Sequence, residues 1–313
     1  MFWTYKCDKC QRVWRYPIRE CIFCRGQVAA TLVKEARLKC ESRVMVASPD
    51  NLAAPYRVQL LTDKDGNYFL KKKKEEKEPG RKAGVEVAVV KTDYSPAAAA
   101  KMAMALLKWP TKPIDKVLVK PNLAVAREGS SGIVTNPLVV EGVVEFLLEE
   151  KGIKPENLIV GECSVLGFNT GEAALKSGLL DVCQKHGVKF VDLATRGYLA
   201  KDISYQNRKF RFEISELETE ADLIVNVPVV KTHFQTGWSL ALKNMKGLVS
   251  YGTRKLMHKE DLDNQIVLLN TVIKKYLTVL DGSVALEGMG PANLGSAVDL
   301  GLIIAGFDPV AVE

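Results

Sequence analysis

The sequence has no long run of uncharged apolar residues, few aromatic residues and only three histidines. Aromatic side chains make up 7% of its 313 residues. No stretch approaches the ~18 uncharged apolar residues that a membrane-spanning helix needs. The N-terminus also lacks the basic segment followed by an apolar one that is typical of a secretory signal. We therefore expect a cytoplasmic protein that has no membrane partner.

Two fingerprints of common nucleotide-binding enzymes are also absent. The sequence contains neither the Gly-rich P-loop pattern nor the G-x-G-x-x-G pattern of dinucleotide-binding folds. A flexible segment from Gly129 to Gly132 leads instead into Thr135-Asn-Pro137, which is typical of a helix start. The free N–H groups of such a start can bind phosphate or carboxylate. These features argue against an ordinary NTPase or NAD-dependent enzyme.

The charge of the chain is distributed unevenly. Residues 1–82 hold 19 Lys and Arg against 10 Asp and Glu, whereas residues 83–313 hold 25 against 27. A basic front region joined to a near-neutral body predicts units with different partners. The composition is that of an ordinary soluble globular protein. The excess positive charge is a modest indication of a polyanionic partner such as nucleic acid or coenzyme A.

Four of the seven cysteines stand in two C-x-x-C pairs, Cys7 with Cys10 and Cys21 with Cys24. Each pair can present two thiolates from one tight turn, and a short hairpin between them would bring the pairs together. Four thiolates form the usual ligand set of a structural zinc ion, with no coordination position left open. We predict a zinc ribbon over residues 1–27. Rubredoxin-like iron is the alternative metal, and redox disulfides are disfavoured in a reducing compartment.

Residues 28–92 are predicted to form a small β-barrel. Segments 56–61, 68–70 and 85–90 are typical of strands, and a turn with Asp-Gly separates the first two. Short strands linked by such hairpin turns favour a barrel of the OB type.

The ribbon and the barrel together resemble the proteins of domain of unknown function family 35. The resemblance is based on the C-x-x-C pairs, on Pro17 and Arg19 before the second pair, and on Pro55-Tyr56 at the entry to a strand. It covers residues 1–92 and implies a zinc ribbon plus OB-fold that accompanies acyl-CoA enzymes such as thiolases. An acyl-CoA enzyme is therefore an expected partner.

From residue 93 to residue 313, short apolar runs alternate with helical segments. The predicted strands are 116–119, 158–160, 189–193, 222–228, 277–280 and 300–304, and the predicted helices are 95–108, 136–152, 170–187, 237–247 and 261–275. This alternation predicts an α/β domain over residues 93–313, with a mostly parallel sheet and helices on both faces. An antiparallel hairpin is expected over residues 203–213.

Polar residues cluster after the predicted strands. Ligands of open parallel sheets bind beyond the carboxyl ends of the strands, so these residues predict a polar cleft. The candidate catalytic residues are Glu162, Lys231, His233 and Asp281, and the candidate ligand-binding residues are Lys120, Asn122, Thr135, Lys243, Asn244 and His258. Half-buried lysines need a carboxylate partner or an anionic ligand. The alternative is a structural network in which Glu162 and Asp281 pair with the lysines.

Two further roles are open within this set. Glu162 or His233 could move protons during a reaction. Asp281 and His258 could together hold a second, divalent metal ion. We expect His258 to lie in a loop between helices.

The same segments resemble the blocks of domain of unknown function family 362. The matching blocks are Val119-Lys-Pro-Asn122, Thr135-Asn-Pro137, Gly161-Glu162, Val230-Lys-Thr-His233, Leu242-Lys-Asn-Met-Lys-Gly247, Asp281-Gly282, Glu287-Gly-Met-Gly-Pro291 and Asp308-Pro-Val-Ala311. They occur in family order across about residues 85–313. Some relatives add a ferredoxin-like iron–sulfur module, for which this sequence has no further Cys cluster. The resemblance implies little about a reaction. The family pattern continues into a helix where this sequence ends, so we expect a truncated chain.

Three functions are consistent with these features. The first is an enzyme acting on a small anionic metabolite, a carboxylate, a phosphate or an acyl-CoA-linked compound, with the front domains used for docking. The second is a nucleic-acid-binding protein that uses the basic ribbon and barrel. The third is a scaffold whose cleft is only structural. The polar residues at several strand ends favour the enzyme.

Overall fold

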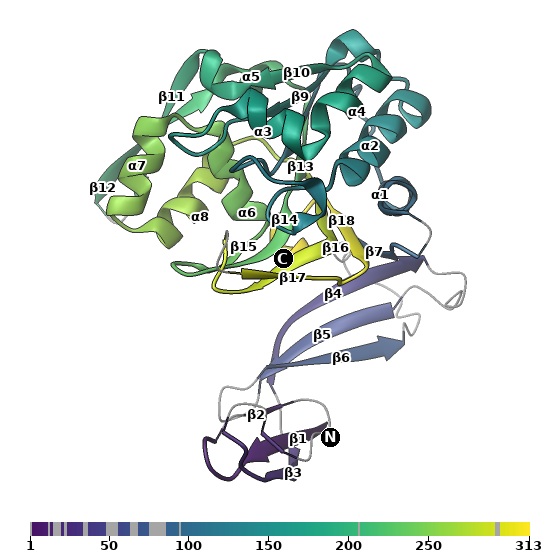
Figure 1. Cartoon of the computed structure of the whole chain (residues 1–313), viewed down its shortest axis with the longest axis vertical. Helices are drawn as coiled ribbons and strands as arrows, with labels where there is room; N and C mark the ends of the chain where they lie inside the picture. Colours follow the sequence, from purple (N-terminus) through teal and green to yellow (C-terminus); the bar gives the residue numbers. More distant parts are fainter. Residues whose placement is uncertain are drawn as a thin grey trace. The chain divides into compact units, whose positions relative to one another are not determined.

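The chain divides into two compact units in a computed structural model (Figure 1). One unit comprises residues 1–44 and 55–84, and the other comprises residues 45–54 and 85–313. The structure describes residues 2–11, 13–14, 20–21, 24–33, 37–47, 56–62, 68–74, 86–93, 95–205, 207–291 and 295–313. The domain boundaries predicted after residues 27 and 92 stay a prediction.

The first unit holds antiparallel strands in its described residues. They are β1 (Phe2–Cys7), β2 (Val13–Trp14), β3 (Val28–Val33), β4 (Arg37–Ala47), β5 (Tyr56–Thr62) and β6 (Tyr68–Lys74). β1 pairs with β2 and β3, and β5 pairs with β4 and β6. The predicted strands 56–61 and 68–70 are present, whereas the turn between them lies outside the described residues. Closure into an OB barrel stays a prediction.

The second unit is built on a mostly parallel sheet, as the alternation of strands and helices predicts. Its main strands are β7 (Glu86–Lys91), β8 (Val117–Pro121), β9 (Leu158–Glu162), β10 (Lys189–Asp192), β13 (Leu223–Val227), β14 (Val229–His233), β16 (Leu277–Gly288) and β18 (Leu302–Gly306). Seven of them are ordered β10-β9-β8-β13-β16-β18-β7, and β14 pairs with β16 outside this order. The first five are parallel, and only β18 runs against its neighbours in this series.

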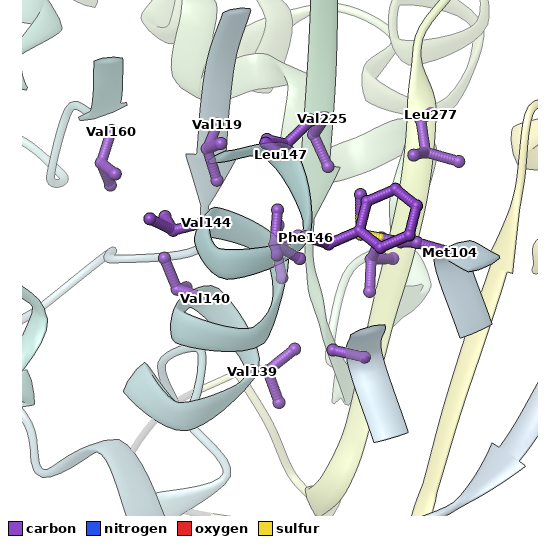
Figure 2. Packing of buried hydrophobic residues seen from close by; sticks show 14 of the residues in the cluster. Met104, Val119, Val139, Val140, Val144, Phe146, Leu147, Val160, Val225 and Leu277 are labelled. Carbon is purple, nitrogen blue, oxygen red and sulfur yellow. The ribbon is translucent and has the colours of Figure 1, made fainter. Parts of the chain in front are cut away.

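Helices cover both faces of this sheet (Figure 1). They are α1 (Pro96–Ala105), α2 (Pro137–Glu145), α3 (Thr170–Ser177), α4 (Leu179–His186), α5 (Glu216–Glu220), α6 (Ala241–Asn244), α7 (Tyr251–Lys259), α8 (Leu262–Val272) and α9 (Pro309–Val312). Successive strand side chains point to opposite faces. Val119 and Val225 therefore pack with α1 and α2, whereas Leu118 and Ile224 pack with α7 and α8. Figure 2 shows the first of these two cores around α2.

The predicted helix starts are confirmed where a capping residue precedes proline. The Ser95 side chain accepts a hydrogen bond from Ala98 N, and the Asn136 side chain accepts one from Leu138 N. Both caps satisfy backbone N–H groups that a helix start leaves free. None of the helices in the described ranges is long and apolar enough to cross a membrane.

Three predicted helices differ from the observed ones. The helix predicted at 136–152 is α-helical only to Glu145 and ends in a π-helical turn. The helix predicted at 170–187 breaks at Gly178, whose φ of 85° separates α3 from α4. The helix predicted at 237–247 begins instead as β15 (Gly237–Ser239), because these residues pair with β14 before α6 starts. Pairing across the hairpin overrides local helix propensity here.

Of two other local predictions, one is confirmed and one is wrong. The predicted hairpin is present and longer than expected, as β11 (Tyr198–Tyr205) paired with β12 (Arg208–Ser215). The expectation that His258 lies in a loop is wrong, because His258 belongs to α7. The side chain of Ser250 accepts a hydrogen bond from Thr253 N and starts that helix earlier than the apolar pattern indicates.

A substitution at Gly142 tests how closely α1 and α2 pack. A Cβ atom at Gly142 would collide with the backbone of Ala97. Helix propensity favours alanine by about 1 kcal/mol, whereas overpacking a core costs about 1–3 kcal/mol. We expect Gly142→Ala to lower the free energy of unfolding in urea, followed by circular dichroism. Leu138→Ala, at an exposed position of α2, is the control and should change it little. A more stable Gly142→Ala protein would contradict the close approach.

Candidate functional site

A cavity of about 160 Å³ lies at the carboxyl ends of β8, β9 and β14, where the sequence predicts a polar cleft. Parallel strands bring their carboxyl ends to one edge of a sheet, so the residues that follow them meet there. The cavity is lined by Asn122, Ala124, Glu162, Cys163, Val165, Lys231, His233, Ser239, Lys243, Asn244, Lys246, Gly247, Arg254, His258 and Pro291. Seven of the ten predicted site residues outside the ribbon are thus brought together.

A buried ion pair forms the floor of this region. Lys120 Nζ, on β8, lies 2.7 Å from Glu162 Oε1, on β9, and both side chains are almost completely buried. The second carboxylate oxygen of Glu162 accepts a hydrogen bond from Cys163 N. Burial lowers the pKa of Lys120, while the charge of Glu162 opposes that shift. Each oxygen of Glu162 thus has a partner in the conformation observed, and a catalytic role for this carboxylate stays a prediction.

Lys231 is held by a connected set of amides. Its Nζ donates to Asn122 Oδ1 at 2.6 Å and to the carbonyl oxygen of Ile133 at 2.9 Å. Asn122 Nδ2 donates to Asn244 Oδ1 at 3.0 Å, and Asn244 Nδ2 donates to Asn226 Oδ1 at 2.8 Å. This chain of donors fixes the orientation of each amide. The position of Lys231 therefore depends on residues from β8, β13 and α6.

Three more cations face the cavity from α6 and the segments after it. Lys246 Nζ lies 2.7 Å from His258 Nε2, and Lys243 Nζ donates to Thr236 Oγ1 at 3.1 Å. One terminal nitrogen of Arg254 donates to the carbonyl oxygens of Cys163 and Ser164. Within the described ranges, none of Lys231, Lys243, Lys246 and Arg254 forms an ion pair with a carboxylate. The cavity therefore carries uncompensated positive charge.

This arrangement makes the lysines easier to deprotonate. Burial lowers the pKa of Lys231 to about 8, the charge of Glu162 opposes that shift, and the nearby charge of Lys120 adds to it. Burial, with the charge of Arg254 adding to it, lowers the pKa of Lys246 to about 8. Burial and the charges of Lys246 and Lys231 lower the pKa of Lys243 to about 6. A bound anion would reverse these shifts, because an opposite charge favours the protonated amine.

The two histidines of the cavity are held as neutral rings. His233 Nδ1 accepts hydrogen bonds from the backbone N–H groups of Gln235 and Thr236, which assigns its proton to Nε2. Burial lowers the pKa of His233 to about 3, with the charges of nearby lysines acting in the same direction. His258 accepts from Lys246 through Nε2, and its Nδ1 lies 3.1 Å from Gln235 Oε1. His233 is thus suited to donate a hydrogen bond rather than to take up a proton.

Thr135, Lys120 and Asp281 are the predicted site residues that do not line the cavity. The Thr135 hydroxyl accepts from Asn122 N and donates to the carbonyl oxygen of Val227, so it braces the ends of two strands. Asp281 is fully buried and accepts from Asn136 N at 2.8 Å.

The observed hydrogen-bond partners of Asp281 are not the lysines that the sequence analysis offered as one alternative. Burial raises the pKa of Asp281 to about 6, although hydrogen bonds from Asn136 and Ser283 favour the charged form. Within the described ranges Asp281 forms no ion pair with a lysine. The second metal site at Asp281 and His258 stays a prediction. Asp281 holds the start of α2 in place.

The cavity also contains residues that the sequence reasoning did not select. Lys246 carried a signal, since it follows Lys243 by three residues and shares its helix face. Cys163 also carried a signal, since it directly follows Glu162 at the end of β9. Arg254 carried none that spacing reveals, because it reaches the strand ends from a separate helix. Gly247 is required by close approach, since a Cβ atom there would lie 2.5 Å from Lys120 Nζ.

The four predicted ligand cysteines lie together in the first unit. Cys7 Sγ lies 3.4 Å from Cys24 Sγ, and Cys10 Sγ lies 3.5 Å from Cys21 Sγ. All four sulfur atoms lie within 4.8 Å of one another, and none is in a disulfide. Such a cluster could hold one metal ion, because a tetrahedral thiolate site needs four sulfurs around one centre.

A second group of potential ligands lies on α2 and α4, away from the cavity. It consists of Glu141, Glu145 and His186. Lys185 Nζ lies 2.5 Å from Glu141 Oε1, and Lys101 Nζ lies 3.3 Å from Glu145 Oε2. These ion pairs already compensate both carboxylates, so the group is explained as a link between helices.

Comparisons with known proteins show the family of the chain. A thylakoid-associated protein, sll1697, from Synechocystis sp. (strain PCC 6803) is 29% identical over 208 residues. The match covers 64% of this chain and 62% of that protein. The lactate racemase apoprotein from Thermoanaerobacterium thermosaccharolyticum is similar with a TM-score of 0.44 and 16% identity, over 76% of this chain and 58% of that one. Residues 117–313, more than half of the chain, match the family described as Domain of unknown function (DUF362). The chain therefore belongs to the DUF362 family.

Proposed function

We propose that the second unit is an enzyme that binds a small anionic metabolite in the cavity at the ends of β8, β9 and β14. The observation that carries this proposal is the convergence of Lys231, Lys243, Lys246 and Arg254 without a carboxylate partner among the described residues. Glu162 pairs with Lys120, and its charge also acts on Lys231, so one carboxylate faces several cations.

Uncompensated buried charge is costly, and an anionic ligand would remove that cost. The effective penalty for burying an unpaired charged group is several kcal/mol. A purely structural network would be expected to place carboxylates beside the lysines, as Glu141 stands beside Lys185. In the cavity, by contrast, none of the four cations forms an ion pair with a carboxylate among the described residues. A carboxylate or phosphate group in the cavity would supply the missing negative charge.

The size of the cavity narrows the ligand class. At about 160 Å³ it is smaller than the ~300–1,000 Å³ of sites that enclose drug-sized ligands. A small carboxylate or phosphate compound fits this volume, whereas a whole coenzyme does not. For an acyl-CoA-linked substrate, only the acyl group would enter.

The residues around the cavity suggest distinct roles. Lys231, Lys246 and Arg254 would hold the anionic group through charge-assisted hydrogen bonds. Asn122 and Asn244 would orient Lys231, and Glu162 would hold Lys120 in place beneath them. His233, with its proton on Nε2, would donate a hydrogen bond to an oxygen of the ligand. The site thus offers donors that are preorganised for negative charge.

We also propose that the four-cysteine cluster holds a structural zinc ion. The sulfurs of Cys7, Cys10, Cys21 and Cys24 supply the complete ligand set, which leaves no position for a substrate. Reduced thiolates persist in the cytoplasm, so this site supports a cytoplasmic location for the protein. Iron in the same ligand set is the alternative.

The first unit would dock a partner. Its net positive charge and its resemblance to domain of unknown function family 35 support an acyl-CoA enzyme as that partner. Nucleic acid is the alternative, and its binding would weaken steeply with rising salt concentration.

Loss of one cation should weaken anion binding. We expect Lys246→Met and Arg254→Met each to reduce the affinity of the full chain for sulfate by about 10–100-fold. This range follows from about 1.5–3 kcal/mol for a hydrogen bond to a charged group. Isothermal titration calorimetry with sodium sulfate, at constant ionic strength set with chloride, measures the effect.

The matched control for these variants is Lys255→Met. Lys255 lies on α7 beside Arg254 but is exposed and does not line the cavity. It should keep the affinity of the unchanged protein. Equal losses in all three variants would indicate a general effect of net charge and would sink the proposal, as would the absence of sulfate binding.

The affinity for sulfate should fall as the pH rises from about 7 to about 9. Lys231 and Lys246 have pKa values of about 8, so both lose their charge across this range. Because the bound anion favours the protonated amines, binding takes up protons, and affinity decreases by at most about tenfold per pH unit for each lysine. Sulfate keeps a constant charge here. Calorimetry at several pH values measures the change, and an affinity that rises with pH would contradict it.

The purified full chain should contain about one zinc ion, because one tetrahedral site uses all four cysteines. We expect Cys21→Ser to lower the zinc content measured by plasma mass spectrometry. Cys183→Ala, which removes a buried thiol from α4, is the control and should leave the zinc content unchanged. Iron with a visible thiolate absorption band would show that the metal is not zinc.

A further inference from the structure

The four lysines at the cavity differ in how their amino groups are occupied. Lys120 Nζ pairs with Glu162, and Lys231 Nζ donates to Asn122 Oδ1 and to a backbone carbonyl. Lys246 Nζ lies against the ring nitrogen of His258. Each of these three amines is positioned as a protonated donor by strong acceptors. Lys231 and Lys246, which line the cavity, are therefore suited to hold a ligand in place.

Lys243 is in a different situation. In the described part of the chain its Nζ has one hydrogen-bond partner, the hydroxyl of Thr236 at 3.1 Å. That hydroxyl donates its own proton to the carbonyl oxygen of Trp238, so it accepts from the lysine. Lys243 lines the cavity and forms no ion pair within the described ranges, although the charge of Asp263 acts on it. This leaves a lone pair available toward the cavity once the amine is neutral.

The charged groups around Lys243 favour its neutral form. Lys246 lies on the turn after α6, and Lys231 approaches from β14. Both carry like charge and lower the pKa of Lys243, in addition to burial, whereas Asp263 on α8 opposes the shift. His233 on β14 is neutral. A lysine desolvated beside other cations is a known way to obtain a nucleophilic amine near neutral pH.

We propose that Lys243 is a nucleophile that forms a Schiff base with the carbonyl group of a small oxo acid. This inference rests on the proposed function, since Lys231, Lys246 and Arg254 would hold the carboxylate of that acid. The substrate class is thus narrowed from any small anion to one that carries a ketone or aldehyde near its acidic group. The cavity size agrees with an acid of a few carbon atoms.

The chemical step needs no oxidant or reductant. The neutral amine of Lys243 attacks the carbonyl carbon, and a new N–C bond forms while the carbonyl electron pair moves to oxygen. A proton passes from nitrogen to that oxygen to give a carbinolamine. The hydroxyl group of the carbinolamine then takes up a proton from the solvent, and the C–O bond breaks as the nitrogen lone pair forms the C=N bond. Water leaves, and a protonated imine remains. The positive imine can accept electrons from a neighbouring bond of the substrate, which is the usual purpose of such an intermediate.

Reductive trapping with pyruvate tests the inference. The full chain is incubated at pH 7 with pyruvate and sodium cyanoborohydride, and the adduct is located by peptide mapping with mass spectrometry. An exposed lysine holds on the order of one neutral amine in 10³ at this pH, so random labelling should be slow. We expect the adduct at Lys243, and sulfate should slow its formation by competing for the same cations.

Two variants provide the controls. Lys243→Arg keeps a positive charge but cannot form an imine, so trapping should fall by about tenfold or more relative to the unchanged protein. Lys255→Arg, outside the cavity, should trap at the unchanged rate. If Lys243→Arg fails to fold, peptide mapping of the unchanged protein still decides the question.

The outcomes separate this inference from the proposed function. An adduct spread over exposed lysines, or no adduct at all, overturns the role of Lys243. If sulfate still binds in that case, the anion site stands without a Schiff base. If sulfate also fails to bind, both proposals fall.

Discussion

The buried ion pair between Lys120 and Glu162 is the contact on which the site depends. It joins the ends of two adjacent parallel strands, and the backbone at Cys163 and Gly247 closes around it. Breaking such a pair leaves an isolated buried charge and costs about 3–5 kcal/mol. The pair is therefore strongly constrained. Because Glu162 pairs with Lys120, none of the other cations of the cavity forms an ion pair with a carboxylate in the described part of the chain.

The pairing of Glu162 with Lys120 explains why the cavity is rich in positive charge. Elsewhere in the second unit, lysines near carboxylates pair with them, as Lys101 and Lys201 do. At the strand ends, amides and backbone carbonyls hold the cations in place without neutralising them. Functional sites commonly depart from the arrangement that stability alone would favour. The departure here has one sign of charge, which is the basis for proposing an anionic ligand.

Much of the fold was predictable because it follows from local patterns. Alternating apolar runs and capped helices identified the parallel sheet, and the residues after the strands identified most of the cavity. The errors came where distant segments compete with local propensity. Pairing with β14 turns residues 237–239 into a strand, and a cap at Ser250 places His258 on a helix. Asp281 follows the polar pattern but is directed to the start of α2.

The sequence by itself determined the periodicity, the caps and the spacing of the cysteines, because each depends on residues that are neighbours along the chain. It therefore identified the α/β class, the DUF362 blocks and the four-thiolate cluster. Only the tertiary structure decided which charges meet. Arg254 reaches the cavity from another helix, Glu162 pairs with Lys120, and Lys243 is left with one hydroxyl partner. Electrostatic interactions depend on distance in space and on burial, and neither can be read from position along the chain.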